Sequence, residues 1–139
     1  MTGTGWPMFR PTVLLVEEDD DLRVLFKSAL VFAGFAVADA PGGLEALRYL
    51  ETNRPDVVLL DLMMPGISGF DVRAELRTKA HLRHVPVVVV TAIPIEDLKG
   101  YDARCILTKP VMPADVVVAV RGCLRGSAAT SGGNTPPAP

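Results

Sequence analysis

The sequence predicts an α/β fold in which five parallel strands form one sheet that is covered on both faces by helices. Short runs of valine, leucine and other apolar residues recur five times, as is typical of strands buried on both faces. Stretches with apolar residues at helical spacing lie between most of these runs. Because strands that alternate with helices form parallel sheets, we expect the runs to form one sheet, with right-handed crossovers between its strands. The expected strands are Thr12–Val16, 35–39, Val57–Leu60, 85–90 and 104–108.

The connecting segments differ in how clearly they predict helices. The first helix is expected to stop at Gly34, and the second near Asn53. The third follows Gly69, and Pro113 suits the first turn of the last helix. The segment 93–101 contains a proline and a glycine and has room for only about two turns. The fourth helix is therefore expected to be short or irregular.

Composition excludes several classes of protein. The chain has 139 residues, of which 49% are hydrophobic, and this suits one globular domain. A formal net charge of −2 argues against a basic domain that binds nucleic acid. No apolar run approaches the roughly 18 residues that cross a membrane, and no signal-peptide stretch opens the chain. Cys105 and Cys123 fit neither a metal-binding pattern nor a disulfide framework, which favours reduced thiols in a cytoplasmic protein.

Local composition divides the chain into three regions. Residues 1–10 are expected to form a flexible leader and residues 11–125 the folded domain. Residues 126–139, GSAATSGGNTPPAP, are expected to be a disordered tail. Because this tail is too short and too polar to fold as an effector domain, we expect a stand-alone domain or a fragment excised from a larger protein.

Five acidic residues, Glu17 to Asp21, follow the first expected strand directly. Such a block is ordinarily a solvated tract, but this one is held between a buried strand and a helix. Asp20 or Asp21 can cap the helix and favour its positive end. Capping leaves Glu17 and Glu18 without a structural explanation.

Polar residues also stand where the later strands end. Asp61 ends the third strand, Thr91 the fourth, and Lys109 follows the fifth. Each has an ordinary structural explanation, since Asp begins turns, Thr is common in strands and Lys is usually solvated. However, all parallel strands end at the same edge of the sheet, where α/β proteins bind ligands. We therefore expect these residues to share one pocket with the acids after the first strand.

This set of side chains predicts phosphoryl chemistry. Clustered carboxylates repel each other unless a cation joins them, and oxygen ligands suit Mg²⁺. A carboxylate can also attack a phosphoryl group and form an aspartyl phosphate. A threonine hydroxyl and a lysine ammonium can then hold the phosphoryl oxygens. Phosphoryl transfer depends on such positioning and charge neutralisation more than on covalent help.

These residues resemble those of a known family, the receiver domain of two-component response regulators (CheY-like). The most specific match is PDVVLLDLMMPGISG at residues 55–69, supported by LLVEEDDDLR, VVVVTA and LTKP in the same order. The resemblance covers residues 11–125. It implies a flavodoxin-like, doubly wound (βα)5 fold with the strand order 2-1-3-4-5.

The resemblance also implies a role for each residue of the acidic pocket. Asp61 matches the phosphoacceptor. Glu18 and Asp61 would bind Mg²⁺ together with the backbone carbonyl of Met63, and Glu17 would bind it through water. Glu18 departs from the family, which usually has Asp here, and its extra methylene must bend away to place the oxygen equally well.

A second group of residues matches the family's switch. Thr91 and Lys109 match the switch hydroxyl and the phosphate-pairing lysine, and Ala92 follows as a phosphate-contacting position. The bond between Lys109 and Pro110 is expected to be cis, as the family usually has it. Ile106 stands where the family usually has a switch aromatic residue, so no aromatic swing can be coupled to Thr91.

The resemblance implies a stand-alone receiver that accepts phosphate on Asp61, switches partner binding in a phosphorelay and is not a turnover enzyme. The implied donor is a sensor histidine kinase or a histidine phosphotransfer protein, and the downstream target is a protein. Two alternatives remain open. A phosphorylation-independent pseudo-receiver would use the fold as a binding module, which Glu18 and Ile106 favour. A hydrolase of the haloacid dehalogenase type needs a second acid two residues after the nucleophile, and Met63 argues against it.

Overall fold

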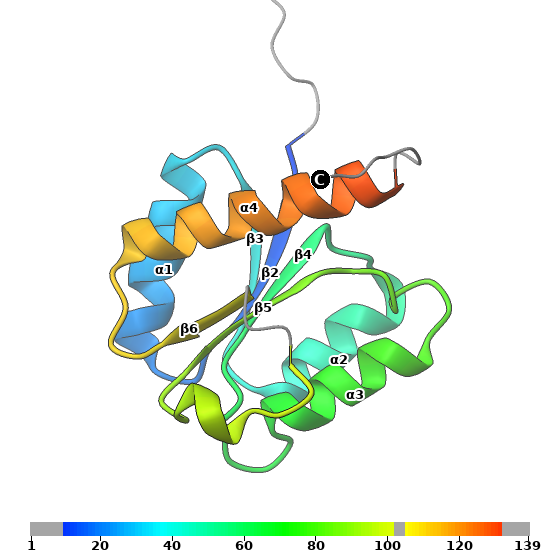
Figure 1. Ribbon diagram of the computed structural model, residues 1–139, viewed down its shortest axis with the longest axis horizontal. Coiled ribbons are helices and arrows are strands. Elements are labelled where there is room, and N and C mark those ends of the chain that lie inside the picture. Colours follow the sequence, from blue (N-terminus) through cyan, green and yellow to red (C-terminus); the bar gives the residue numbers. More distant parts are fainter. Residues whose placement is uncertain (1–9, 102–104, 132–139) are drawn as a thin grey trace, which may run out of the picture.

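The computed structural model describes residues 10–101 and 105–131, which form a parallel sheet between two layers of helices (Figure 1). The strand order is β3-β2-β4-β5-β6, which confirms the expected order 2-1-3-4-5. Helices α1 and α4 cover one face, and α2 and α3 cover the other (Figure 1). The strands are β2 (Thr12–Val16), β3 (Ala36–Ala40), β4 (Val57–Leu60), β5 (Val87–Thr91) and β6 (Ile106–Thr108). The helices are α1 (Asp20–Phe32), α2 (Gly43–Thr52), α3 (Gly69–Thr78) and α4 (Pro113–Ser131).

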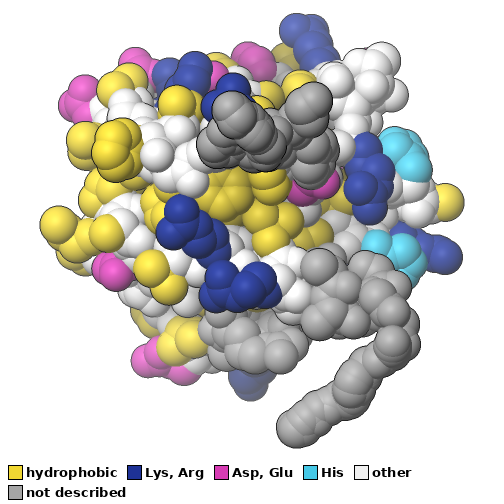
Figure 2. Space-filling model, turned by 90° about the horizontal axis from the view of Figure 1, so that it is seen from above, with side chains coloured by type: hydrophobic (Ala, Val, Ile, Leu, Met, Phe, Trp, Pro, Cys, Tyr) yellow, Lys and Arg dark blue, Asp and Glu magenta, His cyan; other side chains and the backbone are white. Residues whose placement is uncertain are grey.

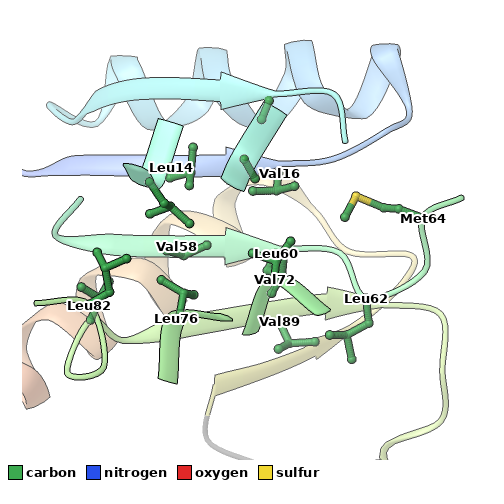
Figure 3. Close-up of a cluster of buried hydrophobic side chains, with 14 of the residues drawn as sticks. Leu14, Val16, Val58, Leu60, Leu62, Met64, Val72, Leu76, Leu82 and Val89 are labelled. Atoms are coloured by element: carbon green, nitrogen blue, oxygen red, sulfur yellow. The ribbon is translucent and has the colours of Figure 1, made fainter. Parts of the chain in front are cut away.

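The central strands explain why the apolar runs are continuous. Successive strand side chains point to opposite faces of the sheet, and here both faces are covered. Leu14, Val58 and Leu60 pack towards α2 and α3 in one buried cluster (Figure 3). Their neighbours Leu15 and Leu59 belong to the second cluster, which includes buried residues of α1 and α4. The sheet is therefore fixed from both sides, and its carboxyl edge is a rigid base for loops.

The end of α1 agrees with the sequence, but its start does not. Gly34 follows the helix with a φ of +102°, a conformation that glycine adopts readily. At the start, Asp19 caps the helix by accepting a hydrogen bond of 3.0 Å from the Leu22 N–H. The expectation that Asp20 or Asp21 is the cap was wrong, because both already lie in the first helical turn.

Two connections near the end of the chain depart from regular alternation. Between β5 and β6 the described residues hold the 3-10 turn η1 (Ile95–Asp97) and no α-helix, so the expectation of a short or irregular fourth helix is confirmed. Helix α4 continues to Ser131, so residues 126–131 are helical although we expected a disordered tail. This stretch includes two alanines, the strongest helix formers. The rest of that tail, 132–139, and leader residues 1–9 lie outside the described residues.

None of the helices in residues 10–101 and 105–131 combines the length and the apolar character needed to cross a membrane.

Candidate functional site

The carboxyl ends of four strands bring together the polar residues that the sequence singled out. Glu17 follows β2 and Asp61 follows β4, and the pairing of Val16 with Leu60 places them on neighbouring strands. Thr91 ends β5, and its carbonyl accepts a hydrogen bond of 2.8 Å from the Lys109 N–H beyond β6. The exposed fractions of Glu17, Asp61 and Thr91 are only 1%, 4% and 0%. Three buried polar side chains at one edge need partners, because an unpaired buried polar group is costly.

Lys109 supplies the partner for both buried carboxylates. Its ammonium lies 3.0 Å from Oε1 of Glu17 and 3.1 Å from Oδ2 of Asp61. Asp61 is also held by the Met63 N–H, which donates a hydrogen bond of 3.0 Å to Oδ1. One oxygen of Asp61 therefore faces a cation and the other a backbone donor, so the carboxylate is held in one orientation at the mouth of its loop.

This cluster shifts two pKa values. Burial raises the pKa of the Glu17 carboxyl, although hydrogen bonds from the Asp19 N–H and from Lys109 oppose the shift. Burial alone would lower the pKa of Lys109, but its hydrogen bonds to Glu17 and Asp61, together with their charges, outweigh burial and raise it. Lys109 therefore stays protonated, whereas ionisation of Glu17 costs stability.

Replacing Glu17 with glutamine is expected to raise the free energy of unfolding at neutral pH. The folded-state pKa of Glu17 lies above its unfolded value, so its stabilising contribution is complete at low pH and is lost as pH rises through the folded-state pKa. Glutamine cannot ionise and avoids this loss. Urea unfolding should show the gap between variant and wild type widening as the pH rises above the ordinary pKa of glutamate. Glu51→Gln, at an exposed position, should show no such gap; equal profiles for both variants would contradict the prediction.

Two contacts fix the loop that carries Glu17. The Arg23 guanidinium donates a hydrogen bond of 2.8 Å to the Glu17 carbonyl and a second of 2.6 Å to Asp20. The Asp19 N–H donates to Oε2 of Glu17 over 3.1 Å. Sequence reasoning did not single out Arg23, because its partner at the site is a backbone carbonyl, which leaves no signal in the pattern of side chains.

Gly69 is a second residue whose role sequence reasoning missed. It begins α3, where the Ser68 hydroxyl caps the helix and Asp71 completes a capping box. Its N–H donates a hydrogen bond of 3.1 Å to the Leu62 carbonyl. A Cβ at Gly69 would overlap the Asp61 carbonyl and come within 2.6 Å of the Leu62 Cα. The glycine therefore lets α3 pack directly on the loop that holds Asp61.

The remaining predicted site residues lie in β5 and β6 or in the segments that follow these strands. The Thr91 hydroxyl accepts a hydrogen bond of 3.3 Å from the Ile93 N–H, and Ala92 between them is exposed. Ile106 is half-buried in β6. The peptide bond between Lys109 and Pro110 is cis, as the resemblance implied.

The acids at this edge fit a divalent cation in part. Mg²⁺ takes oxygen ligands and keeps several waters, so the protein can supply as few as one or two carboxylates. Glu17 and Asp61 already converge on one cation, the Lys109 ammonium. Glu18 is exposed, and the described part of the chain holds no group of three acidic, histidine or cysteine side chains arranged for a metal. A bound metal therefore requires Glu18 to turn inward or Glu17 to take its place.

Comparison with known proteins identifies the class of this domain. The family model for the response regulator receiver domain matches residues 13–121. The chain is 38% identical over 130 residues to the transcriptional regulatory protein CseB of Streptomyces avermitilis, covering 91% of this chain and 54% of that protein. It is 39% identical over 131 residues to the transcriptional regulatory protein PrrA of Mycobacterium tuberculosis, covering 90% and 55%. The chain thus spans about half the length of the curated relatives it matches.

Solved structures agree with this assignment. The receiver domain of the Francisella response regulator 1452 is 28% identical with a TM-score of 0.75, covering 85% of this chain and 99% of that one. The chemotaxis response regulator CheY4 of Vibrio cholerae is 26% identical with a TM-score of 0.77, covering 83% and 99%. The chain belongs to the receiver domain family of two-component response regulators. A receiver domain is not a turnover enzyme, so the alternative of a hydrolase of the haloacid dehalogenase type is wrong.

Proposed function

We propose that this domain accepts a phosphoryl group on Asp61 from a sensor histidine kinase or a histidine phosphotransfer protein, and that the phosphorylated form binds a protein target differently. The observation that carries the proposal is the ion-paired cluster of Asp61, Glu17 and Lys109 at the carboxyl edge of the sheet. Membership of the receiver domain family of two-component systems supports a cytoplasmic location.

The geometry suits transfer in a single step. An oxygen of Asp61 attacks phosphorus, the bond from phosphorus to the donor's imidazole nitrogen breaks, and its electron pair stays with the imidazole. The Met63 N–H and the Lys109 ammonium hold the two carboxylate oxygens, so the nucleophile meets the phosphoryl group in a fixed orientation. Mg²⁺, held by Asp61, the Met63 carbonyl and Glu18 or Glu17, would neutralise charge on the phosphoryl oxygens.

Phosphorylation would reorganise the same contacts. The phosphoryl group adds a charge of about −1.5 to −2 next to Glu17, so Lys109 gains a stronger partner than the carboxylate it holds now. The Thr91 hydroxyl, which accepts from the Ile93 N–H, can turn to donate to a phosphoryl oxygen. That turn would move the backbone at Ala92 and bias the loop towards a second arrangement that a partner recognises.

Incubation with acetyl phosphate and Mg²⁺ tests this function. Intact-mass measurement should show the gain of one phosphoryl group, and omission of Mg²⁺ should abolish the gain. Asp61→Asn removes the nucleophile and should reduce labelling to background while keeping the fold, because asparagine has nearly the same size. Unchanged mass in the wild type, or labelling that persists in Asp61→Asn, would contradict the assignment.

A pseudo-receiver is the second candidate, and one observation favours it. Glu18 is exposed rather than joined to the Glu17 and Asp61 carboxylates, so the metal site is incomplete as it stands. A pseudo-receiver would bind its partner without phosphorylation, and Lys109 would stay ion-paired with Glu17 and Asp61. The acetyl phosphate experiment separates the two candidates, since a pseudo-receiver gains no mass.

A further inference from the structure

A groove lies on the sheet face next to α3, away from the phosphoacceptor. It encloses a cavity of about 210 Å³ between α3, the first part of β5 and the start of β6. Val87, Val89 and Ile106 of the two strands form its apolar floor. Arg73, Leu76 and Arg77 of α3 form one wall. The groove does not include any residue of the Asp61 cluster.

The groove exists because the segment between β5 and β6 is so short. Both faces of a parallel sheet are ordinarily covered by helices. On this face α2 and α3 cover the β3, β2 and β4 side, whereas the described residues between β5 and β6 (92–101 and 105) contain the η1 turn and no α-helix (Figure 1). The apolar floor over β5 and β6 therefore has no helix of the described chain lying on it.

Three arginines surround this apolar floor. The Arg73 guanidinium stacks over the Tyr101 ring at 3.9 Å from its centre, which fixes it at the rim. Arg77 lies one helical turn further along the same side of α3, and Arg83 lies in the loop before β5. Both are exposed, and neither has an ion-pair partner among the described residues. The groove is thus locally basic in a chain whose net charge is −2.

We propose that this groove binds an acidic, amphipathic helix of a partner protein. A helix is the element that ordinarily covers such a strand pair, and its apolar side would meet Val87 and Ile106. The cavity is smaller than the roughly 300–1,000 Å³ of small-molecule pockets but admits one or two apolar anchor side chains. Acidic residues beside those anchors would pair with Arg77 and Arg83.

The loop before β5 places further exposed side chains next to Arg83. In the view from above, which looks onto the side of α4 and not onto the α3 face, both histidines lie at one edge of the molecule with Lys and Arg side chains next to them (Figure 2). His81 and His84 belong to the same loop as Arg83 and are exposed. Electrostatic attraction of an acidic partner would therefore begin before the apolar contacts form.

Two synthetic peptides test the proposal. One is a helical peptide of about 18 residues with leucines along one side and glutamates on both flanks; the other has lysine in place of every glutamate. Fluorescence anisotropy should show the glutamate peptide binding wild type at least about tenfold more tightly than the lysine peptide. Amide chemical shifts should change at Val87, Cys105 and Ile106, which places the peptide in the groove.

Charge-reversal variants make the test specific. The double variant Arg77→Glu with Arg83→Glu should lose or reverse the preference, whereas Arg48→Glu, at an exposed position on α2, should keep it. Circular dichroism checks that each variant is folded. The proposal fails if the preference survives the double variant or if the shifts fall on another surface. Octanoate serves as a small-molecule probe with one carboxylate and an apolar tail. The proposal also fails if octanoate changes the amide chemical shifts of the groove residues and the peptide does not, since the groove would then bind a small carboxylate. Asp61→Asn should leave peptide binding unchanged, so this result is independent of phosphorylation.

Discussion

Gly69→Ala is expected to lower the free energy of unfolding by about 3 kcal/mol and to reduce phosphorylation of Asp61. The added methyl group would overlap the Asp61 carbonyl and approach the Leu62 Cα to 2.6 Å. These are backbone atoms at the end of a strand with no exposed residues, so they cannot move aside as a flexible side chain would. Helix α3 must instead shift away, which disturbs the loop in which the Met63 N–H orients Asp61. Urea unfolding and acetyl phosphate labelling measure the two effects.

Gly122→Ala is the matched control for this substitution. Gly122 lies inside α4, and a Cβ there would meet nothing within 4 Å. Alanine in a helix interior is more favourable than glycine by about 0.5–1 kcal/mol, so this variant should be slightly more stable than wild type and should label normally. Similar stability changes in both variants would show that the close packing of α3 on the Asp61 loop is not what Gly69 provides.

The convergence of the site could be predicted because it follows from topology. Once the apolar runs are assigned to parallel strands, Asp61, Thr91 and Lys109 must end at one edge, whatever their side chains do. The position of a single carboxylate within that edge could not be predicted. Glu17 and Glu18 have the same side chain. The direction in which the chain leaves β2 determines which of them is buried: Glu17 is 1% exposed, whereas Glu18 faces solvent.

Other features escaped prediction because they depend on contacts rather than patterns. Three successive aspartates can each cap a helix, and the choice of Asp19 follows from where the chain leaves β2. Arg23 donates a hydrogen bond to the Glu17 carbonyl, and Gly69 packs closely against the backbone of Asp61 and Leu62. Neither contact involves a second side chain, so neither leaves a motif in the sequence. The sequence predicted that the segment between β5 and β6 is short. It could not predict the basic groove, because the groove depends on the position of α3 next to β5.

The lifetime of the phosphorylated form should depend on two apolar residues beside the site. Met63 and Ile93 each lie two residues after a site residue, Asp61 and Thr91. The Met63 N–H donates a hydrogen bond to the Asp61 carboxylate, and the Ile93 N–H donates one to the Thr91 hydroxyl. Both residues therefore lie next to the site. Neither side chain can orient a water molecule towards the phosphoryl group. We therefore expect a slowly hydrolysing aspartyl phosphate.

Met63→Asn combined with Ile93→Glu is expected to speed phosphate loss by about one to two orders of magnitude, because polar groups at both positions can align the attacking water. Decay of the phosphorylated mass after removal of acetyl phosphate gives the rate. The matched control is Met112→Asn with Ile95→Glu, which makes the same two changes at exposed positions and should leave the rate unchanged. If both double variants decay like wild type, water positioning at these residues does not limit the lifetime, and the shielding of the aspartyl phosphate must come from Lys109 and the buried surroundings of Asp61 instead.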